Sequence, residues 1–154
     1  MSYNRNLYRS LPGGGVVKVQ ESAENYLETI LILSLKGDKV RSIDIVNKLE
    51  YSKPSVSIAL KNLRTRGYIT MDRDGYITLT TAGRKIADAI YDRHVAISDW
   101  LVFLGVDKKT ATEDACKMEH VISQKSFLAI KAHGETLKQE RAGKRTDRSS
   151  APAN

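Results

Sequence analysis

The sequence predicts a mostly α-helical fold with a small β-hairpin, in which an N-terminal winged helix-turn-helix precedes an all-α domain. Three observations support this. Apolar residues recur at helical spacing in three segments between residues 22 and 67. The period then changes to two on either side of an Asp-Gly pair, a strong hairpin signal. Helical spacing returns at Thr81 and continues to about residue 137.

The first predicted helix lies in "SAENYLETILILSLKG". Ser22 is expected to cap its N-terminus, and Gly37 to end it. One face carries the apolar residues that should be buried, namely Ala23, Tyr26, Leu27, Ile30 and Leu31.

Two shorter helices follow, separated by a tight break. "RSIDIVNKLE" is predicted to be capped by Ser42, and "YSKPSVSIALKNLRTRG" has Pro54 in its first turn and Gly67 at its end. The expected buried positions are Ile45, Val46 and Leu49 in the first, and Val56, Ala59, Leu60 and Leu63 in the second.

The hairpin consists of "YITMD" and "YITLT" on either side of "RDG". A long helix is predicted from about Thr81 to Leu104, and Gly105 ends it. Asp107 should cap a further helix that runs through about Gln124, and residues 126–137 continue with helical spacing.

The exposed side of the third helix has the chemistry of a DNA-reading surface. Winged helices also serve as protein-interaction modules, but this side offers hydrogen-bond donors, acceptors, positive charge and one apolar side chain that fits a thymine methyl. Side chains suited to phosphates lie at the start of the helix and on the hairpin. The predicted DNA-contacting residues are Lys53, Ser55, Ser57, Ile58, Lys61, Asn62, Arg64 and Arg73.

Charge and composition narrow the class of protein. Of the net charge of +7, a net +5 falls in residues 36–93, which hold twelve Lys and Arg against seven acids. This basic middle favours a polyanion partner. A single cysteine, no apolar run of bilayer length and no signal-peptide core predict a cytoplasmic protein without disulfides or membrane contact.

The segment "DACKMEHVIS" brings a thiol, a carboxylate and an imidazole onto one helical face, because Cys116, Glu119 and His120 stand at i, i+3 and i+4. Ordinary core residues, a Cys-His nucleophile and a metal site are the three interpretations. The nucleophile also requires an oxyanion site and a cleft, which nothing else in the chain indicates. All three residue types are usual ligands of transition metals.

Two other places add potential ligands. His94 lies within the apolar stripe of the long helix, four residues after Ile90. Asn25 and Glu28 stand at i and i+3 beside the buried face of the first helix.

Over about residues 21–135 the chain resembles the iron- and manganese-dependent repressors of the diphtheria toxin repressor and manganese transport regulator type. "SKPSVSIALKNLRTRGYI", "DRHVAISDW" and "EDACKMEHVIS" carry the resemblance. It implies a homodimer that grips a palindromic operator once Fe(II) or Mn(II) is bound and controls metal-homeostasis genes. Neither an enzymatic reaction nor a small organic substrate is expected.

The resemblance also implies ligand sets. Asn25, Cys116, Glu119 and His120 match a primary site, and Glu28, His94 and Glu119 match a second site of manganese-type members. Cys116 replaces a carboxylate of those members, and a thiolate favours Fe(II), Co, Ni or Zn over Mn. Ser98 and Thr112 stand where the iron-type ancillary site has ligands.

Four parts of the chain are therefore predicted. Residues 1–20 form a flexible arm, 21–82 the DNA-binding winged helix-turn-helix, 83–137 the helical dimerisation and metal-binding domain, and 138–154 a disordered basic tail. The alternative function is a redox-responsive winged-helix regulator that senses through Cys116 without metal.

Overall fold

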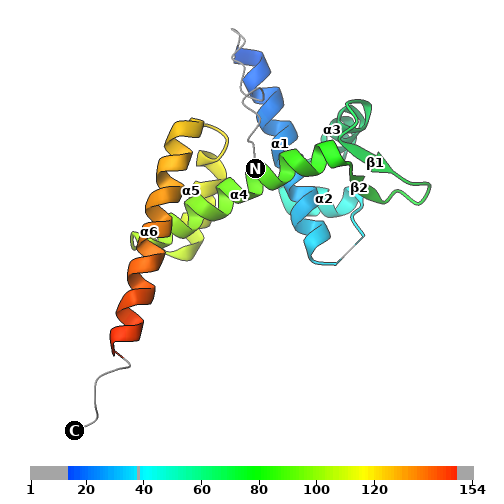
Figure 1. Cartoon of the computed structure of the whole chain (residues 1–154). Helices are drawn as coiled ribbons and strands as arrows, with labels where there is room; N and C mark the ends of the chain where they lie inside the picture. The colour runs from blue at the N-terminus through cyan, green and yellow to red at the C-terminus, as the bar shows by residue number, and fades with distance from the viewer. Residues whose placement is uncertain (1–13, 38, 149–154) are drawn as a thin grey trace. The chain divides into compact units, whose positions relative to one another are not determined.

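The structure is a computed structural model that describes residues 14–37 and 39–148, with side chains over 21–37 and 39–143. The chain forms two compact units, residues 1–87 and 88–154. Each is mostly helical, and the hairpin in the first unit holds the only strands of the described residues (Figure 1). Within that same part of the chain, every helix is too short or too polar to cross a membrane.

The first unit is a winged helix-turn-helix. It contains α1 (Gly14–Leu35), α2 (Ser42–Leu49), α3 (Lys53–Thr65), β1 (Ile69–Met71), β2 (Ile77–Leu79) and the start of α4 (Thr81–Phe103). Helix α1 packs against α2, α3 and β2, and α3 packs against β1. The side chains buried among these elements include Ile30, Val40, Ile45, Val56, Leu60, Leu63, Ile69 and Ile77.

The hairpin is antiparallel, with Thr70 opposite Thr78. Its turn is closed by the Asp72 carboxylate, which accepts hydrogen bonds from the backbone of Asp74 and Tyr76 at 3.0 and 2.9 Å. Val40 forms an isolated β-bridge with β2, because its carbonyl accepts from the Ile77 backbone N–H at 2.8 Å. The predicted change of period therefore corresponds to a real hairpin.

Two predicted helix starts were wrong. Helix α1 begins at Gly14, so Ser22 lies inside the helix and part of the predicted arm is helical; residues 1–13 lie outside the described residues. Helix α2 is capped by Arg41, whose backbone N–H donates to the Asp44 carboxylate at 2.7 Å, and Ser42 is the first helical residue. Pro54 lies in the first turn of α3 as predicted, and the structure shows Ser52 as the N-cap.

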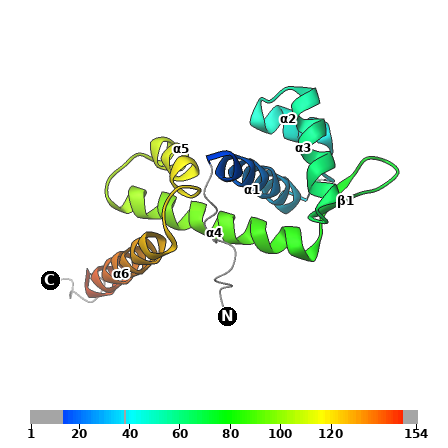
Figure 2. The same cartoon turned by 90° about the horizontal axis from the view of Figure 1, so that it is seen from above.

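The second unit contains most of α4, α5 (Lys108–Met118) and α6 (Gln124–Arg148). Asp107 caps α5 as predicted, and hydrogen bonds from the side chain and backbone of Thr110 hold the pKa of the Asp107 carboxyl below its usual range. Ile90, Ile97, Ala111, Ala115 and Phe127 are buried. Figure 2 shows α5 and α6 beside the C-terminal part of α4.

Helix α6 continues to Arg148, so the predicted disorder from residue 138 was wrong for 138–148; residues 149–154 lie outside the described residues. Contacts with α4 explain the extension. Lys131 binds Asp92 and Lys138 binds Asp99, each at 2.8 Å, and the Arg141 guanidinium lies 4.8 Å from the centre of the Phe103 ring. The polar composition of this segment concealed a helix that is stabilised along one side.

Candidate metal centre and DNA-binding face

Helix α5 ends at Met118, earlier than the predicted end near Gln124. The Glu119 backbone still has helical angles, but the chain then turns, and Ser123 starts the next helix by accepting from the Ser126 backbone N–H at 3.1 Å. Glu119 and His120 therefore lie in the turn between α5 and α6.

Arg93 holds this turn. Its guanidinium donates to the carbonyls of Glu119 and Ile122 at 2.9 and 3.3 Å, and to the side-chain oxygen of Gln124 at 2.6 Å. It also lies 5.1 Å from the centre of the Phe127 ring, and only 3% of the residue is exposed. A buried cation thus satisfies backbone carbonyls just beyond the end of α5 and supports the turn that they belong to.

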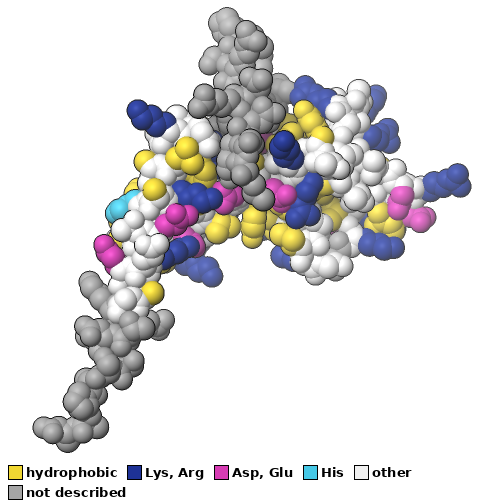
Figure 3. Space-filling model, viewed as in Figure 1, with side chains coloured by type: hydrophobic (Ala, Val, Ile, Leu, Met, Phe, Trp, Pro, Cys, Tyr) yellow, Lys and Arg dark blue, Asp and Glu magenta, His cyan; other side chains and the backbone are white. Residues whose placement is uncertain are grey.

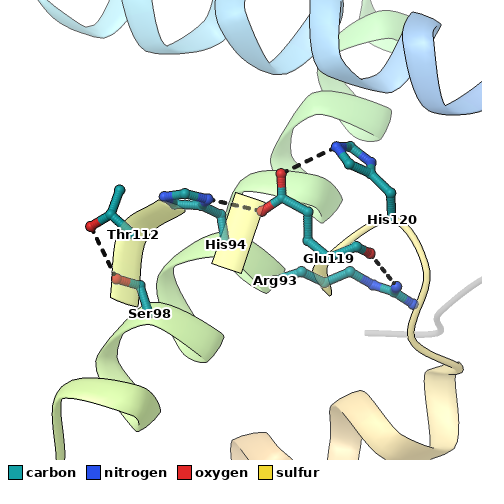
Figure 4. Close-up of polar contacts among 6 residues, drawn as sticks. All are labelled: Arg93, His94, Ser98, Thr112, Glu119 and His120. Carbon is teal, nitrogen blue, oxygen red and sulfur yellow. Dashed lines mark hydrogen bonds and ion pairs between the residues drawn. The ribbon is translucent and has the colours of Figure 1, made fainter. Parts of the chain in front are cut away.

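Two imidazoles face the carboxylate of Glu119, one at each oxygen (Figure 4). His94 Nδ1 lies 2.9 Å from Oε2, and His120 Nε2 lies 3.3 Å from Oε1. The Glu119 side chain is fully buried, and His120 is almost so, whereas 18% of the His94 side chain is exposed. Residues that are far apart in the sequence thus converge on one buried carboxylate.

The Glu119 carboxylate fits a divalent cation. Its Oε1 is buried and accepts no hydrogen bond from the described residues, although His120 Nε2 lies 3.3 Å away. A buried carboxylate without full compensation is costly. Carboxylate oxygen and imidazole nitrogen are ligands that Mn(II) and Fe(II) both accept.

The remaining predicted ligands have different environments. Cys116 is exposed, contrary to the expectation that it is partly sheltered beside the buried stripe of α5. Both predicted ligands on α1 belong to the first unit, where Asn25 is half-buried and Glu28 is buried. Ser98 and Thr112, the positions of the iron-type ancillary ligands, lie together with their hydroxyl oxygens 3.4 Å apart (Figure 4).

Arg93 is the functional residue that the sequence reasoning did not single out. It lies three residues after Ile90 and four before Ile97, both of which are fully buried. A charged residue at that spacing, in the middle of an apolar stripe, was the available signal. The prediction placed His94 on this stripe, but Arg93 is the more deeply buried of the two.

The predicted DNA-contacting residues are all exposed. Seven of the eight lie on α3, opposite the buried Val56, Leu60 and Leu63, and Arg73 lies in the hairpin turn. A groove beside α3 is lined by Lys53, Ser57, Lys61 and Arg64, together with Ser42 and Ile43 from the start of α2. Figure 3 shows many Lys and Arg side chains around α3 and the hairpin.

A winged helix with an exposed basic helix and a separate carboxylate-imidazole cluster defines a DNA-binding regulator with a metal centre. Two domain descriptions match the chain: "Iron dependent repressor, N-terminal DNA binding domain" over residues 18–78, and "Iron dependent repressor, metal binding and dimerisation domain" over 80–146. The chain belongs to the iron-dependent repressor family of metal-dependent transcriptional repressors.

Relatives agree with this assignment. The chain is 34% identical over 113 residues to the transcriptional regulator MntR of Salmonella typhimurium, covering 73% of this chain and 72% of that protein. An uncharacterised HTH-type transcriptional regulator, MJ0568 of Methanocaldococcus jannaschii, is 33% identical over 124 residues, covering 79% of this chain and 99% of its own length.

The diphtheria toxin repressor of Corynebacterium diphtheriae is 30% identical, covering 67% of this chain and 46% of the repressor. Among solved structures, a manganese-dependent transcriptional repressor in complex with manganese superposes with a TM-score of 0.65 at 26% identity. That match covers 73% of this chain but 52% of the other, so the chain spans about half the length of that repressor. These matches support metal control over the redox-responsive alternative.

Proposed function

We propose that the protein is a cytoplasmic homodimeric repressor that binds a palindromic operator when loaded with Fe(II) or Mn(II) and controls metal-homeostasis genes. The observation that carries the proposal is the buried Glu119 carboxylate, which two imidazoles face in a chain that also presents an exposed, basic α3. Metal is a corepressor in this proposal, so no reaction is catalysed.

We propose that Glu119 serves both predicted sites, with one carboxylate oxygen beside His120 in the primary site and the other beside His94 in the second site. When bound, a divalent ion supplies the positive charge that the buried carboxylate lacks. Cys116, Asn25 and Glu28 remain predicted ligands on the strength of the family resemblance, and the variants Cys116→Ser, Asn25→Ala and Glu28→Gln test each of them by metal affinity.

Linkage explains how such a centre controls DNA binding. A metal that binds the DNA-competent dimer more tightly than the other states of the protein raises DNA affinity, and DNA must raise metal affinity by the same factor. At the operator, the exposed residues of α3 read base edges in the major groove, while Lys53 and Arg73 contact phosphates.

The test is a DNA-binding titration. Duplexes are first selected from a random-sequence pool by the Mn(II)-loaded protein, and affinity for them is then measured by fluorescence anisotropy with Mn(II), Fe(II), Zn(II) or a chelator. We expect tight binding that a chelator reverses. Lys61→Ala and Arg64→Ala should weaken binding and flatten its salt dependence. Binding that is equal with and without metal contradicts the corepressor role.

A further inference from the structure

The exposed face of the hairpin carries a second cationic cluster, made of Lys39, Arg41 and Tyr76. The Lys39 ammonium lies 4.7 Å from the centre of the Tyr76 ring, and the Arg41 guanidinium lies 4.4 Å from it. Both cations are exposed, and the ring is half-buried. None of these three residues belongs to the DNA-contacting set on α3 and at Arg73.

The register of the Val40–Ile77 bridge explains this cluster. Val40 pairs with Ile77, and both side chains are buried. Because side chains alternate along a strand, the neighbours of this pair point to the opposite, exposed face. Antiparallel pairing then sets Arg41 across from Tyr76, and Lys39 lies on the diagonal, within reach of the same ring.

The hairpin turn fixes the backbone of Tyr76. The Tyr76 backbone N–H donates to the Asp72 carboxylate at 2.9 Å, and the Tyr76 carbonyl accepts from the Asp72 N–H at 3.0 Å. A cation over the face of an aromatic ring is attracted by the negative charge of that face. Tyr76 therefore holds two flexible cationic side chains together and reduces the conformational freedom that they would lose on binding an anion.

The nearby carboxylates that the structure describes, those of Asp44 and Asp72, are engaged with the backbone and do not neutralise these cations. The Asp44 carboxylate accepts from the Arg41 backbone N–H, and the Asp72 carboxylate closes the hairpin turn. Among the described side chains, no carboxylate forms an ion pair with Lys39 or Arg41. Two adjacent positive charges that pair with no carboxylate of residues 21–37 and 39–143 favour an anionic partner.

The position of the cluster identifies this partner. Arg41 directly precedes Ser42 and Ile43, which line the groove beside α3 together with Lys53, Lys61 and Arg64. The Thr70 and Thr78 hydroxyls lie opposite each other on the same exposed face of the hairpin. Cations and hydroxyls that continue from a base-reading helix match the phosphates that border a major groove.

We propose that Lys39 and Arg41, positioned by Tyr76, bind the DNA backbone beside the groove that α3 enters, independently of base sequence. This inference rests on the proposed DNA-binding function. It predicts a contribution to affinity and to salt dependence, but none to the choice of bases.

The experiment compares variants of the full-length, Mn(II)-loaded protein on the selected duplexes and on a mixed-sequence duplex. Lys39→Gln and Arg41→Gln should each lower affinity by roughly fivefold on both DNAs and reduce the salt slope by about 1. Lys109→Gln removes the same charge from an exposed site on α5 and should match the wild type.

Tyr76 requires its own pair of variants. Tyr76→Phe keeps the ring and should retain wild-type affinity, whereas Tyr76→Leu removes the ring without changing charge and should lower affinity by about threefold. A role in stability alone predicts that both variants bind normally once folded, so thermal melts accompany the titrations.

The outcomes separate the two proposals. Wild-type affinity and salt slope in the double variant Lys39→Gln/Arg41→Gln, together with weakened binding of Lys61→Gln, overturn the phosphate patch and leave the proposed function intact. Failure of the wild-type protein to bind any selected duplex overturns both.

Discussion

The Arg93 guanidinium is hydrogen-bonded to the backbone carbonyl of Glu119, the residue whose carboxylate lies between two imidazoles (Figure 4). The cation thus contacts the backbone of the central residue of the metal centre and leaves its side chain available. It supports the turn that carries the Glu119 and His120 side chains.

Arg93→Met should destabilise the second unit by about 2–4 kcal/mol, because it leaves three oxygen acceptors without their buried donor. It should also weaken Mn(II) binding, since the Glu119 backbone loses its support. Chemical denaturation and calorimetric titration measure the two effects. Lys131→Met, which breaks a half-exposed ion pair with Asp92, is the control and should cost less than about 1 kcal/mol. If Arg93→Met is as stable as the wild type, Arg93 does not support the turn that contains Glu119.

Glu119→Gln should abolish the stabilisation by metal while leaving the apo protein as stable as the wild type or more stable, because it removes a buried charge but keeps the shape. For the wild type, Mn(II) at 100 times its Kd should add about 2.7 kcal/mol to the free energy of unfolding. Thermal melts with and without Mn(II) measure this. The exposed Glu113→Gln should respond to metal normally, and a normal response of Glu119→Gln would refute the proposed centre.

Alkylation and substitution of Cys116 test whether its thiol binds the metal and sets the metal preference. Because the thiol is exposed, iodoacetamide should alkylate it readily in the apo protein, and ligation by Co(II) or Zn(II) should slow the reaction. Cys116→Glu should shift the metal preference towards Mn(II), since a carboxylate suits that ion better than a thiolate does. An alkylation rate that does not change with metal would remove Cys116 from the ligand set.

Gly83→Ala should destabilise the first unit by about 1–3 kcal/mol, because a Cβ there would meet the Tyr68 carbonyl oxygen, a backbone atom that cannot rotate away. The Thr80 hydroxyl donates to the Gly67 carbonyl at 2.7 Å, and this bond holds the start of α4, which contains Gly83, close to the segment that contains Tyr68. Gly143→Ala is the matched control on α6, where a Cβ meets nothing within 4 Å, and should stabilise that helix by about 0.5–1 kcal/mol. Thermal melts followed by circular dichroism measure the change in stability of both variants.

Asp107→Ala should destabilise α5 at neutral pH by removing its cap. Because the folded state lowers the pKa of this carboxyl, the stabilisation is present above the ordinary value of 3.8 and is lost as pH falls through the lower folded value. The difference in melting temperature between variant and wild type should therefore shrink in acid. A difference in melting temperature that grows in acid would show that the ionised Asp107 carboxylate is not the group that stabilises the start of α5.

Local patterns predicted the secondary structure well wherever the deciding interactions were local. The hairpin, the capped starts of α3 and α5, and the apolar stripes depend on residues within a few positions of one another. The predicted ends failed where a distant residue intervened. Arg93 on another helix binds the Glu119 carbonyl where α5 ends, and Asp99 and Phe103 support the part of α6 that composition alone assigned to disorder.

By itself, the sequence determined the order of the elements, the exposed reading face of α3 and the residue types of a metal centre, because periodicity and spacing specify which side chains share a helical face. Only the tertiary structure decided that His94 and His120 face opposite oxygens of a fully buried Glu119 while Cys116 remains exposed. It also decided that a buried Arg93 supports this arrangement, and that Tyr76 gathers two cations at the hairpin. Apart from the neighbouring pair Glu119 and His120, these relationships join residues that are distant in sequence, and packing between elements fixes them in a way that no local pattern records.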